Sequence, residues 1–215
     1  YGEAVRLALA ANRPEHMEAF LLSQFSLSKA DIYRVEGPVN LVRLMQVPDL
    51  VDRPDLKYPP FTPGFPAPLT KKHDLLAAIR KQDILLHHPY QSFQPVLDFL
   101  NIAATDPNVV AIKMTVYRTG TESALMESLI AAARTGKQVT VVVELMARFD
   151  EEANIGWASR LEDAGAHVVY GVYGYKIRAK MLMVVRREEG HLRRYIPLGT
   201  ANYHPRTARL YSDFG

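Results

Sequence analysis

Hydrophobic residues in the second half of the chain alternate between two periods, one typical of strands and one typical of helices. Runs of β-branched residues favour strands, and apolar residues spaced three and four apart favour helices that end before a glycine. Strands are expected at 109–117, 138–145 and 166–172, and helices at 122–134 and 150–163. This alternation indicates right-handed crossovers and a largely parallel sheet with both faces covered by helices.

The pattern then changes to a β-hairpin. Strands are expected at 179–187 and 191–198, separated by Glu188-Glu189-Gly190. A hairpin that follows parallel strands makes the sheet mixed, so the sequence predicts an α/β domain with a mixed sheet flanked by helices.

The first part of the chain is a smaller α+β piece that begins abruptly. Strands are expected at 4–10 and 31–35, and helices at 16–24 and 39–45. Eight of the 14 prolines then fall between Pro38 and Pro68, a density that excludes helix and central strand. The sequence therefore predicts a partial head domain with a Pro-rich linker at 1–70 and a second domain at 71–215.

Composition narrows the class of protein. The 215 residues are 48% apolar, enough for a real core, and contain no cysteine, which excludes disulfides, thiolate nucleophiles and Cys-bound metals. No apolar run approaches the roughly 20 residues of a spanning helix. The absence of an initiator Met and of a signal stretch predicts a soluble piece of a longer, cytoplasmic protein.

Charge is uneven along the chain. The net charge is +3, but residues 176–211 hold nine Lys and Arg against two Glu. This excess favours an anionic partner such as phosphate or nucleic acid, and a solvated hairpin face is the alternative.

Two further motifs do not indicate a functional site. Val110-Ala111-Ile112-Lys113 and Asp213-Phe214-Gly215 match pieces of a protein kinase, but no glycine-rich loop precedes the first and no His-Arg-Asp loop precedes the second. His87 and His88 are adjacent and point to opposite faces of a strand, which favours a structural pair over a metal site.

One region has a more specific pattern. Lys176-Ile177-Arg178-Ala179-Lys180 opens a strand, and Gly199-Thr200-Ala201-Asn202 follows about twenty residues later. The pair resembles the H-x-K…G-[ST]-x-N half-site of phospholipase D-like enzymes. In that half-site, the resemblance implies, His attacks phosphorus while Lys and Asn hold phosphate oxygens.

Longer motifs make the resemblance closer. They are Tyr58-Pro59-Pro60-Phe61-Thr62-Pro63, Leu86-His87-His88-Pro89-Tyr90, Ile112-Lys113 with Tyr117-Arg118, the segment from Glu144 to Asn154, and Thr207-Ala208-Arg209-Leu210-Tyr211. Together they resemble polyphosphate kinase of the first, phospholipase D-like type over essentially the whole chain. The chain would then hold the end of a head domain and the first of two catalytic domains.

The resemblance implies reversible transfer of the ATP γ-phosphate to inorganic polyphosphate through a phosphohistidine, with Mg²⁺ as cofactor. Lys180 and Asn202 would hold phosphate, and Tyr211 would contact the adenine nucleotide. Arg118 and Arg148 match positions of the magnesium–phosphate site. A guanidinium has no lone pair for a metal, so we expect both to clamp phosphate oxygens that the ion bridges.

The chain departs from the family pattern at the nucleophile. Arg178 stands where the family has His, Ala201 where it has Gly, and Pro197 where it usually has His. Arginine stays protonated at working pH and has no nitrogen lone pair with which to attack phosphorus. It can still bind the phosphate. Because phospholipase D-like chemistry uses two facing half-sites and this sequence holds one, without the start of the head domain, we expect this chain alone to be inactive.

Three alternatives follow. The first is a catalytically silent polyphosphate- or anion-binding module, which Arg178 favours. The second is a phosphodiesterase with water as the final acceptor. The third is nucleic-acid binding by the basic hairpin. It is not expected, because Tyr195 and Tyr203 are the only aromatic residues among the basic ones there.

We further expect a homo-oligomer in the full-length protein. The basic pI is compatible with peripheral association with anionic membranes, although no amphipathic anchor supports it.

Overall fold

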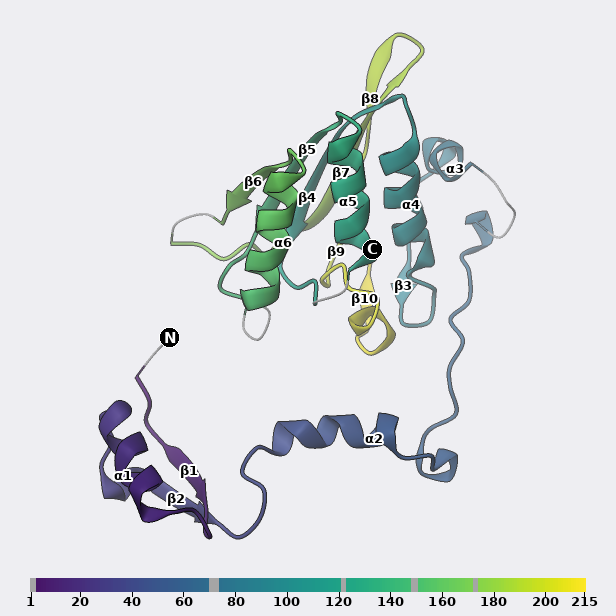
Figure 1. Ribbon diagram of the computed structural model, residues 1–215. Coiled ribbons are helices and arrows are strands. Elements are labelled where there is room, and N and C mark those ends of the chain that lie inside the picture. The colour runs from purple at the N-terminus through teal and green to yellow at the C-terminus, as the bar shows by residue number, and fades with distance from the viewer. Residues whose placement is uncertain (1–2, 70–73, 121–122, 148–150, 172–173) are drawn as a thin grey trace. The chain divides into compact units, whose positions relative to one another are not determined.

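The computed structural model describes residues 3–69, 74–120, 123–147, 151–171 and 174–215. The chain forms two compact units, residues 1–60 and 61–215, which divide within the Pro-rich segment (Figure 1). The assignment of the two parts to a head domain and a catalytic domain, with a boundary near residue 70, stays a prediction.

The first unit is a small α+β piece in which the expected strands and first helix are present, but the helix expected at 39–45 is a 3₁₀ segment. Its elements are β1 (Leu7–Ala10), α1 (Glu15–Gln24), β2 (Ile32–Val35), a 3₁₀ segment (Leu41–Gln46) and α2 (Val47–Leu50). Strands β1 and β2 pair in parallel, and Pro14 precedes the first helical residue. Proline is suited to a helix start because its fixed φ matches the helix and its missing N–H needs no partner there.

The second unit is an α/β domain. Its elements are α3 (Leu75–Lys81), β3 (His87–His88), α4 (Gln94–Thr105), β4 (Val109–Val116), α5 (Ala124–Arg134), β5 (Gln138–Val143), α6 (Glu151–Asp163), β6 (His167–Tyr170), β7 (Lys180–Glu188), β8 (His191–Tyr195), β9 (Leu198–Gly199) and β10 (Asp213–Phe214). Each strand and helix predicted from periodicity between 109 and 198 is present, but the strand expected at 191–198 is divided into β8 and β9. The predicted ends at 122, 150 and 172 lie outside the described residues. Within the described residues, no helix is long and apolar enough to cross a membrane.

The main sheet is mixed. Its strand order is β6-β5-β4-β7-β8, with β6, β5 and β4 parallel, β7 and β8 antiparallel, and β9 paired with the start of β7. The predicted α/β class with a mixed sheet is therefore confirmed. Glu189 and Gly190 connect β7 to β8 with φ of 49° and 81°. Positive φ at both residues is the turn geometry whose twist suits a hairpin.

The expectation that helices cover both faces of the sheet is wrong for the described residues. Helices α4, α5 and α6 all lie over one face (Figure 1). Each crossover steps outward in the same direction, from β4 to β5 to β6, and right-handed crossovers that step one way place their helices on one side. The opposite face carries half-buried or exposed side chains such as Lys113, Thr140 and Val142.

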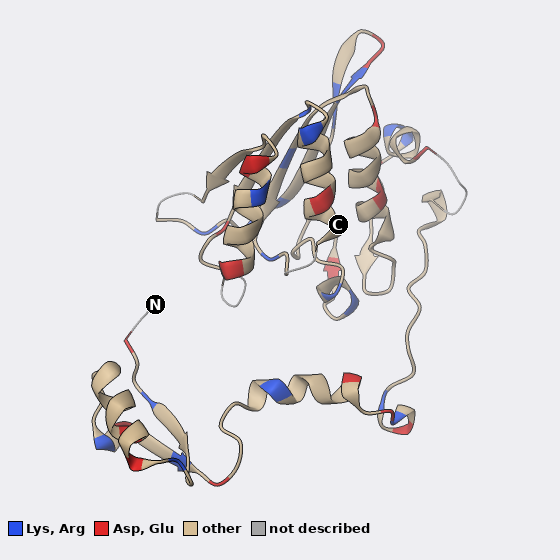
Figure 2. Ribbon diagram, viewed as in Figure 1, with Lys and Arg blue, Asp and Glu red and all other residues tan. Residues whose placement is uncertain are grey.

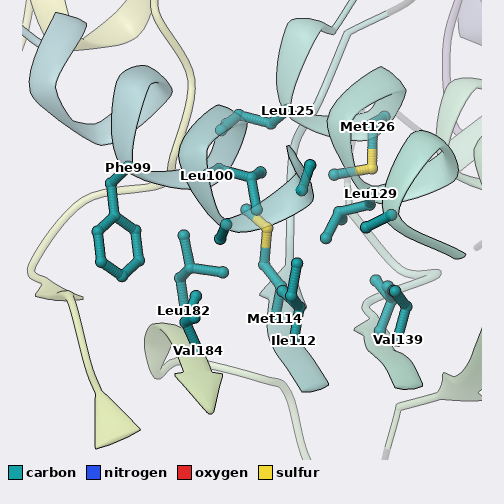
Figure 3. Close-up of a cluster of buried hydrophobic side chains, with 14 of the residues drawn as sticks. Phe99, Leu100, Ile112, Met114, Leu125, Met126, Leu129, Val139, Leu182 and Val184 are labelled. Carbon is teal, nitrogen blue, oxygen red and sulfur yellow. The ribbon is translucent and has the colours of Figure 1, made fainter. Parts of the chain in front are cut away.

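The core lies between the sheet and these helices (Figure 3). Ile112 and Met114 of β4 and Leu182 of β7 point toward Leu100 of α4 and Leu129 of α5 (Figure 3). Alternation along the strands and 3.6-residue periodicity along the helices bring these apolar positions to one layer. The core fixes where the polar ends of β4, β5 and β7 lie.

We expect Leu129→Ala to lower the free energy of unfolding by about 3 kcal/mol, because it leaves a cavity in this layer. Leu129 is fully buried, whereas Leu192 on β8 is 61% exposed. Leu192→Ala is therefore the matched control and should leave no cavity. Urea unfolding of both variants measures the difference. Equal losses for the two variants would contradict the position of the core.

Candidate phosphate-binding site

The segment before β7 is held on one side by Glu144. This residue follows β5 and is buried. Its Oε2 accepts a hydrogen bond from the backbone N–H of Ile177 at 2.9 Å, and its Oε1 accepts one from Met146 N–H at 2.9 Å. The carboxylate therefore joins the loop after β5 to the backbone next to Arg178.

Thr115 of β4 holds the same segment on its other side. Its hydroxyl donates to the carbonyl of Ala179 at 2.7 Å and accepts from Met181 N–H at 3.0 Å. Arg178 lies between the two contacts and is exposed. The backbone is fixed on both sides of residue 178 while its side chain remains accessible to a ligand.

Lys180 begins β7 beside the second half of the motif. It pairs with Gly199 of β9, its Nζ donates to the carbonyl of Arg178 at 2.7 Å, and its Nζ lies 5.5 Å from the centre of the Tyr117 ring. Burial, and to a lesser degree the charge of Arg178, lower the pKa of Lys180. A bound anion would offset both effects, so the ammonium is suited to holding phosphate.

Asn202 lies in the turn that follows Gly199. The next residue, Tyr203, is buried, and its hydroxyl contacts the carbonyls of Pro197 at 2.9 Å and Lys180 at 3.2 Å. Burial, with the charge of Asp213, raises the pKa of Tyr203, so the phenol stays protonated and donates. The structure thus brings the predicted residues Arg178, Lys180 and Asn202 to the neighbouring ends of β7 and β9.

Strand β10 holds this turn through hydrogen bonds to Thr200. Thr200 N–H donates to the carbonyl of Phe214 at 2.9 Å, and Phe214 N–H donates to Thr200 Oγ1 at 2.9 Å. Asp213 and Phe214 pair in turn with His88 and His87 of β3. The Asp213-Phe214-Gly215 triplet therefore has a structural role in holding the turn.

The two histidines occupy different surroundings, as expected for adjacent strand residues. His87 is half-buried and stacks on Phe214 with ring centres 4.5 Å apart. His88 is buried, and its Nδ1 lies 3.4 Å from Asp213 Oδ1 at the edge of a largely apolar cavity of about 510 Å³ that Asn202 also lines. Across the described part of the chain, no three His, Asp or Glu side chains converge as a metal site.

The remaining predicted residues differ in how far the structure places them. Arg118 is half-buried just beyond the end of β4. Tyr211 is 63% exposed on the turn before β10, where a ligand can reach the ring. Arg148 lies outside the described residues. The roles predicted for these three residues stay predictions.

Sequence reasoning missed Asn154, which ties the strand ends together. This fully buried α6 residue donates through Nδ2 to the carbonyls of Tyr117 and Glu144, each at 3.0 Å, and accepts from the Thr119 hydroxyl at 3.1 Å. An Asn among the apolar positions of a helix is the signal that could have identified it, because a buried amide needs hydrogen-bond partners.

The Lys and Arg residues of 176–211 lie near both ends of β7 and in the segment after β9. At the hairpin, Arg186 Nε lies 2.7 Å from Asp106 and its Nη1 lies 2.8 Å from Glu188, which also pairs with Arg193 at 3.1 Å. Figure 2 shows charges of both signs on this β7–β8 hairpin. Arg186 and Arg193 are thus partly neutralised by carboxylates, whereas Arg187 and Arg194 on the same hairpin are exposed. Arg178 and Lys180 lie at the other end of β7, next to the turn that bears Asn202.

Comparisons with known proteins agree with the motifs. The family model described as Polyphosphate kinase middle domain matches residues 1–47, and the one described as Polyphosphate kinase C-terminal domain 1 matches residues 74–215. A polyphosphate kinase of Burkholderia lata is 62% identical over the whole chain, and one of Neisseria meningitidis serogroup C is 60% identical. The chain covers 32% and 31% of these relatives.

A solved structure is also similar. The crystal structure of polyphosphate kinase from Porphyromonas gingivalis aligns with 97% of this chain at a TM-score of 0.69 and 29% identity, over 32% of its own length. The chain therefore spans about a third of the length of the relatives it matches.

We expect Arg186→Met to lower the free energy of unfolding at pH 7 by about 2 kcal/mol, because it removes the partner of two largely buried carboxylates. Although burial opposes the shift, hydrogen bonds from Asn108 N–H and Arg186 lower the pKa of Asp106. Burial also opposes the shift at Glu188, but hydrogen bonds from Tyr195 and Arg186 lower the pKa of its carboxyl group.

A lowered carboxyl pKa stabilises the fold above the ordinary value of about 4 and ceases to do so as pH falls through the folded value. The loss in Arg186→Met should therefore be largest near pH 7 and shrink toward pH 2.5, as measured by urea unfolding. Arg187→Met, on the same strand with an exposed side chain, is the control. An undiminished loss at pH 2.5 would rule out the ion-pair explanation.

Proposed function

Because the chain belongs to the polyphosphate kinase family, we propose that its 176–202 region is a half-site for inorganic polyphosphate. In the longer protein, this half-site would serve the reversible transfer of the γ-phosphate between ATP and a polyphosphate chain. Arg178, Lys180 and Asn202 would contact phosphate oxygens, Arg118 and Arg148 would clamp the chain, and Tyr211 would contact the nucleotide.

One observation carries the proposal: two cationic side chains project from a backbone that is fixed by Glu144 and Thr115, beside the turn that bears Asn202. Phosphoryl transfer depends mostly on positioning and on neutralising charge, and cationic side chains on a fixed backbone would supply both. Two of the four hairpin arginines, Arg186 and Arg193, engage carboxylates instead, which lowers the positive charge available to a nucleic acid there.

The described residues do not form a magnesium site by themselves. Guanidinium and ammonium groups offer no lone pair to a metal, and both oxygens of Glu144 already accept backbone N–H groups. Octahedral Mg²⁺ takes oxygen ligands and is often held by substrate phosphates. The ion would therefore arrive with the nucleotide, held by its phosphate oxygens.

Residue 178 decides which chemistry this half-site can perform. In the family mechanism, a histidine nitrogen lone pair forms a bond to the γ-phosphorus while the bond to the ADP oxygen breaks, and a terminal polyphosphate oxygen then takes the phosphoryl group. Arg178 has no such lone pair. This favours the second candidate for this chain, a polyphosphate-binding module that is silent in covalent transfer.

We expect Lys180→Ala and Arg178→Ala each to weaken binding of long-chain polyphosphate by about tenfold, because each removes one charge-assisted phosphate contact. Arg187→Ala removes the same charge from an exposed position on the hairpin and should change affinity less than twofold. Fluorescence titration with labelled polyphosphate at fixed salt measures all three. Equal losses in all three variants would mean non-specific attraction to positive charge.

We expect Arg178→His, in the full-length protein, to yield acid-labile, base-stable protein phosphate from [γ-³²P]ATP and ATP synthesis from ADP and polyphosphate. The unsubstituted protein and an Arg178→Gln variant should give neither, because neither side chain has a nucleophilic nitrogen. Phosphorylation of all three would place the nucleophile elsewhere, and its absence from Arg178→His would count against the half-site.

A further inference from the structure

Glu144 is an unexpected residue in a site for anions. Its carboxylate is buried next to the segment that carries Arg178 and Lys180, where a negative charge opposes the binding of phosphate. Each carboxylate oxygen, however, accepts one backbone N–H, from Met146 and from Ile177. The two donors come from separate loops, so the side chain bridges segments more than thirty residues apart.

We propose that Glu144 is a positioning residue, whose carboxylate sets the backbone at Ile177 so that residue 178 projects toward the bound phosphate. The inference rests on the proposed function of the half-site. Thr115 makes the complementary contacts at Ala179 and Met181, and residue 178 is the position between these two supports. Neither Glu144 nor Thr115 needs to touch the ligand.

Charge and position predict opposite results when Glu144 is changed to Gln. Removing a negative charge beside an anion site should tighten binding if charge alone matters. A glutamine has the same shape but only one acceptor oxygen, so its NH₂ group would face one of the two N–H donors and lose that contact. If the carboxylate positions residue 178, Glu144→Gln should weaken binding.

A mutant cycle separates positioning from general damage to the site. If Glu144 acts through residue 178, the effect of Glu144→Gln must vanish in an Arg178→Ala background. If the substitution instead disturbs Lys180 or Asn202, the same loss persists there. Thr115→Val, an isosteric change that removes only the hydroxyl, provides a second variant that acts on the other side of residue 178.

The experiment is titration of the chain with long-chain polyphosphate. We expect Glu144→Gln and Thr115→Val each to raise Kd about fivefold and to have less than a twofold effect in the Arg178→Ala background. Glu152→Gln makes the same change in net charge at an exposed helix position and should not raise Kd. An unchanged or lower Kd for Glu144→Gln, or a full fivefold loss in the Arg178→Ala background, would overturn the proposal.

Amide hydrogen exchange distinguishes this failure from that of the proposed function. If the unsubstituted chain does not bind polyphosphate, the proposed function fails, but exchange at the Ile177 amide still reports on Glu144. Exchange there should be at least about fivefold faster in Glu144→Gln than in the unsubstituted chain. Unchanged exchange would show that the carboxylate does not hold this segment.

Discussion

The site depends on one physical requirement: buried backbone groups at the ends of β4 and β5 must find hydrogen-bond partners. The Asn154 side chain meets it by donating to the carbonyls of Tyr117 and Glu144 together. Leaving either carbonyl unpaired in this buried place would cost about 1–3 kcal/mol. Because α6 carries Asn154, the packing of the helix and the geometry of the strand ends are set by the same residue.

The fixed ends of β4 and β5 explain why the candidate site forms where the antiparallel strand β7 joins the parallel strands. Strands β4 and β5 are parallel, and β7 returns antiparallel to β4. The start of β7 therefore lies next to the end of β4, within reach of Thr115 and of Glu144 beyond β5. Antiparallel pairing places the start of one strand beside the end of its neighbour, so residues more than thirty positions apart in the sequence, such as Glu144 and Ile177, come into contact.

Much of the fold follows from the sequence, because its elements have strong local signals. The strands at 109–117 and 138–145 are rich in β-branched residues, and the hairpin turn contains Gly190, which readily adopts the positive φ found there. The one-sided layer of helices was missed because periodicity reveals elements but not the order of strands, and only that order decides on which side each crossover lies.

The motif residues of the candidate site could be predicted from the sequence, but the residues that hold the backbone around them could not. Lys180 and Asn202 belong to a spaced pattern that can be read in one dimension, whereas Glu144 and Asn154 act through backbone groups of distant loops. Strand β10 was also missed, since it has two residues and shows no periodicity, and the pairing of β10 with the two-residue strand β3 was not predicted. Their pairing is a tertiary contact, and no local pattern encodes it.

The supports also explain how arginine can stand at residue 178 without disturbing the fold. Glu144 contacts the N–H of Ile177, Thr115 contacts the carbonyl of Ala179, and Lys180 Nζ contacts the carbonyl of Arg178 itself. All three contacts involve backbone atoms, which every residue except proline provides alike. The exposed side chain at 178 is thus free to differ while the backbone keeps its place. On the proposed function, a guanidinium in place of an imidazole would change what the half-site can do to a phosphate, while the backbone geometry that presents residue 178 would stay the same.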